Sequence, residues 1–138
     1  MTPTLLKHPA DARGEQVISP ETSAAMRALL RYVVTNGTGR KADVPGYDVG
    51  GKTGSAEKNG PHGYMAHKLV TSFCAVFPIE EPRYLVFVML DEPHGTKATA
   101  GFALAGYTTA PLAGHVISRI APLLGVPMKP VAAAKENS

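Results

Sequence analysis

The sequence predicts an α/β fold of the α+β type, a three-stranded antiparallel sheet with one helix before it and one after it. Apolar residues recur at helical spacing over 20–36 and again from Thr109, each time after a capping signal. Between about 48 and 91, strand-like apolar runs are joined by short links rich in Gly and Pro. Tight links of this kind indicate an antiparallel meander.

The first helix is predicted to begin after Ser19 and to end at Gly37. Ser19 is a favoured N-cap, Pro20 suits the first helical position, and Glu21 lies in the first turn, where a carboxylate complements the helix dipole. The preceding residues, 1–16, are predicted to be an extended lead-in. The expected apolar face of the helix consists of Met26, Leu29, Leu30, Val33 and Val34.

The three strands are expected in order along the chain: the first carries Lys52, the second spans 69–77, and the third spans 83–90. The third strand is apolar at every position from 84 to 90, so it has two apolar faces. That pattern is typical of a central strand covered on both sides.

A loop rich in Gly, Ala and Thr, at 93–106, leads to the second helix, which Thr109 and Pro111 are predicted to start and which ends near 122–125. The residues expected on its apolar face are Leu112, Val116, Ile117 and Ile120. The loop contains His94 and Lys97, to which no role is assigned. The tail at 127–138 is predicted to be disordered.

Length and composition limit the classes of function. With 138 residues the chain is one domain or part of one. The formal net charge of +3 comes without a basic cluster interleaved with aromatic residues, so a nucleic-acid partner is not expected. Cys74, the single cysteine, is expected to be a small buried apolar residue. No metal set, cofactor motif, signal peptide or membrane span is predicted; His62 and His67 lack further metal ligands.

The segment Gly46-Tyr47-Asp48-Val49-Gly50-Gly51-Lys52-Thr53 matches two unrelated motifs. It has the spacing of the phosphate-binding loop G-x-x-x-x-G-K-[ST], and the apolar run ending in Asp91-Glu92 resembles the acidic strand of an ATPase. That loop must follow a buried strand and open a helix. The residues at 38–45 are polar and interrupted by Pro45, and those at 54–63 are too rich in Gly to form a helix, so the context disfavours nucleotide binding.

The second match is Lys52-Thr53-Gly54, the Lys-Thr-Gly triplet of penicillin-binding proteins and serine β-lactamases. Its surroundings extend the match: the stretch 17–26, which leads into the first helix, the turn Asn36-Gly37-Thr38-Gly39, and Val44-Pro45-Gly46-Tyr47 before the triplet. In this order they closely resemble class B penicillin-binding proteins, and most of all the septal cell-division transpeptidase of Gram-negative bacteria. The resemblance covers about 3–126 and implies the C-terminal portion of a transpeptidase domain over 1–126.

The resemblance implies the roles of the site residues. Lys52 would supply a positive field and orient a serine of the family's second motif. The hydroxyls of Thr53 and Ser55 would bind the substrate carboxylate, and the backbone N–H of Ser55 would form half of an oxyanion hole. Gly54 would let the substrate approach the strand closely. The implied ligands are peptidoglycan stem peptides and β-lactams.

Two of the family's three motifs are missing from this sequence. No Ser-x-Asn is present, and the one Ser-x-x-Lys, Ser55-Ala56-Glu57-Lys58, continues the triplet strand instead of starting a helix. The chain is therefore expected to be inactive alone and to depend on upstream sequence of its own domain, including two further strands. The resemblance also implies cell-division partners and a location at the periplasmic face of the inner membrane, with the anchor upstream. Self-association of the isolated chain is expected, and a non-catalytic interaction module remains an alternative.

Overall fold

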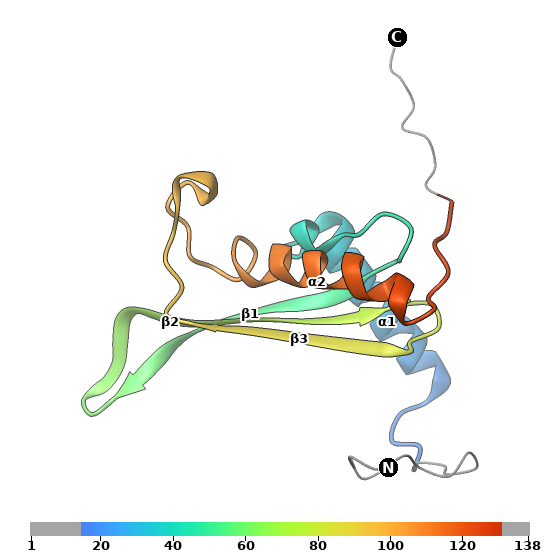
Figure 1. The fold of residues 1–138 in the computed structure, drawn as a ribbon. Helices are drawn as coiled ribbons and strands as arrows, with labels where there is room; N and C mark the ends of the chain where they lie inside the picture. The colour runs from blue at the N-terminus through green and yellow to red at the C-terminus, as the bar shows by residue number, and fades with distance from the viewer. Residues whose placement is uncertain (1–14, 131–138) are drawn as a thin grey trace.

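The computed structural model describes residues 15–130. They form α1 (Pro20–Asn36), the 3-10 turn η1 (Arg40–Ala42), β1 (Gly50–Gly60), β2 (Gly63–Phe77), β3 (Tyr84–Asp91), the 3-10 turn η2 (Lys97–Thr99) and α2 (Thr109–Leu123) (Figure 1). The predicted α+β class and the order of its elements are confirmed. The predicted lead-in is described only from residue 15 onward, and the predicted tail only as far as residue 130.

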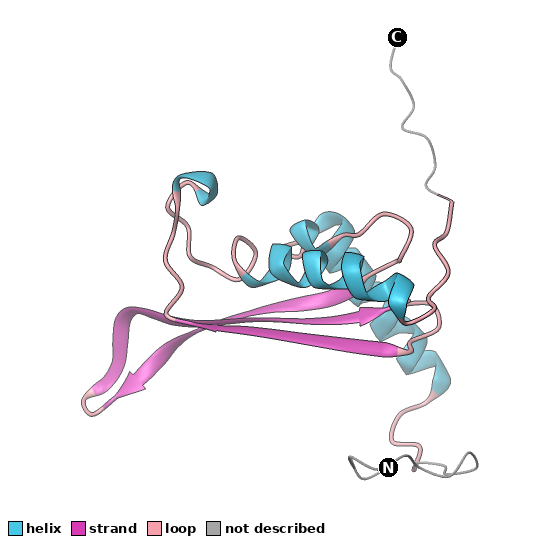
Figure 2. Ribbon diagram, in the orientation of Figure 1, coloured by secondary structure: helices cyan, strands magenta, loops and turns pink. Residues whose placement is uncertain are grey.

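The sheet has three strands in the order β1-β2-β3, and both pairs are antiparallel. The register places Lys52 opposite Cys74, which in turn lies opposite Phe87. The start of the second strand was predicted wrongly, because β2 begins at Gly63 rather than at residue 69. The added residues lack an apolar alternation, but their backbone pairs with the end of β1 in a hairpin that extends past the helices (Figure 2).

One face of the sheet packs against α2 and carries the core (Figure 1). The β2 side chains Phe73, Ala75 and Phe77 are fully buried there, as is Ile117 of α2. The prediction for the apolar face of α2 was only partly right, because Leu112 is 39% exposed and the buried positions are mostly small residues. These positions are Thr109, Ala110, Ala113, Gly114, Ile117 and Ala121.

Close approach of α2 to η1 explains why small residues face the core. A Cβ atom on Gly114 would lie 3.2 Å from the backbone carbonyl oxygen of Lys41, so that position tolerates almost no side chain. A helical-wheel pattern counts large apolar residues and therefore misses an inward face built from Ala and Gly.

α1 has the predicted ends. The Ser19 hydroxyl accepts a hydrogen bond from the Thr22 N–H at 3.2 Å, and the Gly37 N–H closes the helix on the Val33 carbonyl at 3.0 Å. Of its predicted apolar face only Val34 is buried, whereas Met26 and Leu29 are 48% and 60% exposed. Within the described residues, most of this face has no covering element.

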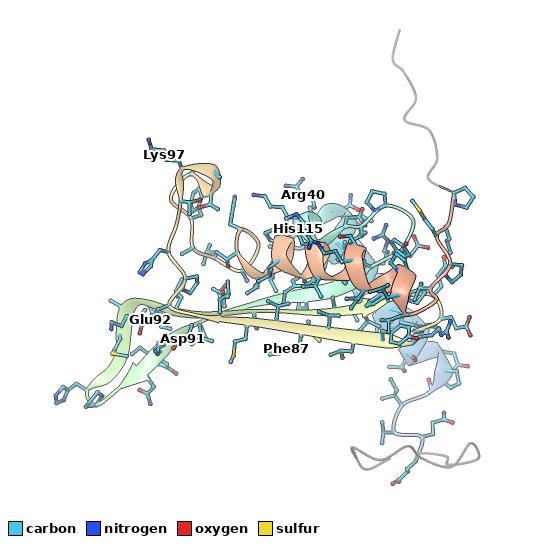
Figure 3. All side chains as sticks on the ribbon, viewed as in Figure 1. Arg40, Phe87, Asp91, Glu92, Lys97 and His115 are labelled. Carbon is cyan, nitrogen blue, oxygen red and sulfur yellow. The ribbon has the colours of Figure 1, made fainter. Side chains whose placement is uncertain are left out.

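β3 lies at the edge of the sheet, and only one of its two apolar faces is covered. Val86 and Val88 pack against the core beneath α2. On the opposite face Leu85, Phe87 and Met89 are 63%, 59% and 61% exposed, and Figure 3 shows Phe87 pointing away from α2. The sequence of β3 is apolar on both faces, but among the described residues only one of these faces is covered.

Candidate functional site

The free edge of β1 lies beside the turn that follows α1. Within the described residues β1 pairs only with β2, so its other edge is open. The Thr38 hydroxyl lies 2.8 Å from the Thr53 hydroxyl, which joins this turn to the strand. A Cβ on Gly39 would lie 3.2 Å from the Phe73 ring, so a glycine here lets the turn settle onto the sheet.

A cavity of about 710 Å³ opens along this edge. Three segments line it: the turn after α1, the triplet strand and the end of the loop before α2. The lining residues are Asn36, Gly37, Thr38, Arg40, Lys41, Lys52, Thr53, Ser55, Leu104, Ala105, Gly106 and Tyr107. Three of the four predicted site residues thus meet at one cavity, and Gly54 lies between two of them in sequence.

Strand alternation separates the side chains of the triplet. Thr53 and Ser55 share one face of β1, and Lys52 starts from the other. The Lys52 side chain is exposed and returns to the strand edge, where its Nζ donates a hydrogen bond to the Thr53 carbonyl at 2.7 Å. The same ammonium lies 3.5 Å from the Thr53 hydroxyl, so a cation and a hydroxyl stand next to each other.

The loop before α2 is tied to the triplet strand. The Ala105 N–H donates a hydrogen bond to the Ser55 hydroxyl at 3.1 Å. A Cβ on Gly106 would lie 2.7 Å from the Thr38 carbonyl oxygen, so only glycine permits this approach. By contrast, Figure 3 shows Lys97 at the far tip of the loop, and neither Lys97 nor His94 lines the cavity.

The residues that sequence reasoning missed are Thr38, Arg40, Lys41 and Tyr107. Lys41 places its ammonium 4.5 Å from the centroid of the Tyr107 ring, and Tyr107 stacks on Phe102 at 5.0 Å. The turn containing Thr38 was recognised only as part of a family resemblance. For the loop before α2, Gly106 was a signal in the sequence, because a glycine often stands where the backbone is approached closely.

Gly54 lies close to a side chain of the neighbouring strand. A Cβ at this position would lie 2.6 Å from the Ser72 hydroxyl on the neighbouring strand. The hydroxyl can rotate away and the next atoms of Ser72 lie at 4.0 Å, so we expect Gly54→Val to lower the free energy of unfolding by no more than about 1 kcal/mol. We also expect it to slow acylation of the full-length protein, because a branched side chain blocks the strand edge.

The double variant Gly54→Val/Ser72→Ala separates these two effects. Removing the Ser72 hydroxyl is expected to recover most of the melting temperature while acylation stays slow. Thermal unfolding and the rate of penicillin acylation check this. If the double variant recovers both quantities, Gly54 serves packing alone and has no part in substrate approach.

The string from Ser55 to Lys58 lacks the geometry of a nucleophile and its base. Both residues lie on β1 instead of on one turn of a helix. Lys58 forms ion pairs with Asp91 and Glu92, each at 2.9 Å. These hydrogen bonds, to Asp91 first and then to Glu92, raise the pKa of the Lys58 ammonium, whereas a general base must give up its proton near neutral pH.

Nucleotide binding is excluded by the same strand. β1 continues through Thr53 to Gly60, so no helix follows the lysine to hold phosphates. The acidic pair at the end of β3 binds lysines: Asp91 pairs with Lys58, and Glu92 pairs with Lys58 and, at 3.5 Å, with Lys68 (Figure 3). The phosphate-binding-loop interpretation is therefore wrong.

The fold and the sequence together define the class of protein. The family model described as "Penicillin binding protein transpeptidase domain" matches residues 1–112. The chain belongs to this family. The predicted resemblance to class B penicillin-binding proteins is thereby confirmed.

Particular relatives narrow the family further. The chain is 46% identical over 137 residues to a "Probable peptidoglycan D,D-transpeptidase FtsI" of Caulobacter vibrioides, a match covering 91% of this chain and 23% of the relative. The transpeptidase domain of Burkholderia pseudomallei penicillin-binding protein 3 is 36% identical with a TM-score of 0.73, over 88% of this chain and 36% of that one.

A third similar protein was solved with a β-lactam. Penicillin-binding protein 3 of Mycobacterium tuberculosis, complexed with ampicillin, is 31% identical with a TM-score of 0.70. The match covers 86% of this chain and 27% of that chain. The chain thus spans roughly a quarter to a third of the relatives' lengths.

Proposed function

We propose that residues 1–126 are the C-terminal portion of a peptidoglycan D,D-transpeptidase domain and hold the carboxylate of its substrate. The observation that supports this most is the cavity at the free edge of β1, where Lys52, Thr53 and Ser55 meet. A carboxylate requires a fixed cation and hydroxyl donors, and this edge supplies both. None of the residues lining the cavity is acidic.

Each residue has a part in the proposed reaction. Lys52 provides the positive field, and Thr53 and Ser55 donate hydroxyl hydrogen bonds to the carboxylate of a stem peptide or a β-lactam. The Ser55 N–H stabilises the tetrahedral intermediate. The nucleophilic serine and its lysine come from another part of the domain, because the one Ser-x-x-Lys of this chain, Ser55 to Lys58, lies on a strand and its lysine is held in ion pairs. That serine attacks the carbonyl carbon next to the terminal D-alanine, the amide bond breaks, and D-alanine leaves with a proton on its amine. The acyl group then passes from the serine oxygen to an amine of a second peptide.

The same proposal includes a cellular setting. The transpeptidase acts in septal cell-wall synthesis at the periplasmic face of the inner membrane, together with cell-division proteins. Among residues 15–130, no helix has the length and apolar character needed to cross a membrane.

The proposed function is tested with the full-length protein that contains this chain. A synthetic peptide ending in D-alanyl-D-alanine is incubated with the protein and an acceptor amine, and released D-alanine and cross-linked product are measured. A fluorescent penicillin should label the protein covalently and block both products. Absence of labelling and of D-alanine release would contradict the proposal.

We also propose that the isolated chain self-associates. The open face of β3 combines exposed Leu85, Phe87 and Met89 with a strand edge that pairs with no other strand among residues 15–130, and such edges recruit other chains. Size exclusion with light scattering at low micromolar concentration should therefore detect species larger than a monomer.

Matched substitutions locate the surface responsible. Phe87→Lys should shift the isolated chain toward monomer, because a lysine on an edge strand opposes pairing. Leu123→Lys should not, although Leu123 is 85% exposed, because it lies at the end of α2 and outside the sheet. A wild-type chain that elutes as a pure monomer contradicts the proposal.

A further inference from the structure

The cavity carries more positive charge than one carboxylate needs. Among the described residues, its lining includes Arg40, Lys41 and Lys52 and no Asp or Glu. Arg40 and Lys41 lie on the turn η1. The acidic residue nearest to η1 in sequence is Asp43, and it forms an ion pair with Arg31 at 2.7 Å. Within residues 15–130, Arg40 and Lys41 take part in no ion pair. Two cations besides Lys52 are therefore available to a ligand.

Arg40 and Lys41 lie on a different side of the cavity from Lys52. They lie on η1. The turn before η1 is held against β1 by the hydrogen bond between the Thr38 and Thr53 hydroxyls, which lie 2.8 Å apart. The Lys41 ammonium makes a cation–π contact with the Tyr107 ring, 4.5 Å from its centroid. The ammonium has three N–H donors, so donors that do not face the ring can bind a ligand. Figure 3 shows Arg40 extending away from the sheet.

The cavity is also large for a single carboxylate. Its volume of about 710 Å³ lies within the range of pockets that hold drug-sized ligands. An extended peptide whose terminal carboxylate rests on Lys52 and Thr53 would place an inner residue farther along the cavity.

We propose that Arg40 and Lys41 form a second anion subsite, which binds a free carboxylate on the side chain of an inner residue of the donor peptide. The inference rests on the proposed function, in which Lys52 binds the terminal carboxylate. The subsite selects peptides with two carboxylates over peptides with one. Both cations are exposed, so the preference is modest, about threefold to tenfold, and high salt weakens it.

The test compares two donor peptides on the full-length protein. Both end in D-alanyl-D-alanine, and they differ only in whether the inner side-chain carboxylate is free or converted to a carboxamide. We expect kcat/KM for D-alanine release to favour the free carboxylate by about threefold to tenfold at low salt. The difference should lie in KM and shrink at about 0.5 M salt, where screening is strong.

Variants assign the preference to the two residues. Arg40→Gln/Lys41→Gln should bring the ratio of the two peptides close to one, and Lys41→Arg should keep it. Arg119→Gln removes an exposed positive charge from α2, outside the cavity lining, and should leave the ratio unchanged. If the double variant unfolds, the single variant Arg40→Gln tests the subsite. The Arg40 side chain is exposed, so its replacement should not unfold the protein, and it should lower the ratio of kcat/KM for the two peptides.

The failure of this inference differs from the failure of the proposed function. Equal kcat/KM for both peptides in the wild-type protein, with ordinary D-alanine release, overturns the subsite and leaves the transpeptidase proposal intact. A preference that persists in the double variant also overturns it. No D-alanine release from either peptide overturns the proposed function itself.

Discussion

The isolated 138-residue chain, incubated with a fluorescent penicillin and run on a denaturing gel, is expected to show no labelled band. A covalent adduct requires an activated nucleophile, and the triplet can orient a carboxylate but cannot attack a carbonyl. Ser55 is the serine closest to the triplet, and its hydroxyl already accepts a hydrogen bond from the Ala105 N–H.

Raising the pH should not produce labelling. A base for Ser55 would have to come from Lys58, and the carboxylates of Asp91 and Glu92 raise the pKa of that ammonium above its ordinary value of 10.5. Lys58 therefore stays mostly protonated at neutral and mildly alkaline pH. The full-length protein, labelled in parallel, is the positive control. A stoichiometric band that survives denaturation of the isolated chain would contradict the prediction and make Ser55 a nucleophile.

Local sequence signals predicted the elements that depend on local interactions. The capping of α1 by Ser19 and its end at Gly37 follow from hydrogen bonds within a few residues, so propensity rules sufficed. The antiparallel meander follows from short links. The early start of β2 at Gly63 could not be recognised in the sequence, because backbone pairing in a hairpin needs no apolar pattern.

Features that depend on contacts between distant segments were missed. The inward face of α2 consists of small residues because α2 lies against η1, about 70 residues earlier in the chain. The second wall of the cavity exists because Gly106 lies against Thr38 and Ala105 binds Ser55. No spacing rule relates these positions, so the sequence indicated the triplet as a motif but not the segments that lie around it in the fold.

In the full-length protein, Lys52→Ala is expected to slow penicillin acylation by about 10²–10³-fold, the usual cost of removing one preorganised electrostatic contact from an active site. The Lys52 ammonium lies 2.7 Å from the Thr53 carbonyl, so an anion bound at Thr53 meets its field directly. Ser55→Thr should cost little, because it keeps both the hydroxyl and the backbone N–H. Time courses of labelling at several penicillin concentrations give the acylation rate constants.

Lys58→Ala is the matched control for Lys52→Ala. It removes the same charged group from the same strand, six residues farther along, where the ammonium is paired with Asp91 and Glu92. Ion pairs at the protein surface contribute little to stability, and we expect acylation close to the wild-type rate. If Lys58→Ala slows acylation as much as Lys52→Ala, acylation depends on the total positive charge of β1 and not on the position of Lys52. A near-wild-type rate for Lys52→Ala would mean that the carboxylate is held elsewhere, and Arg40 and Lys41 would be the next cations to test.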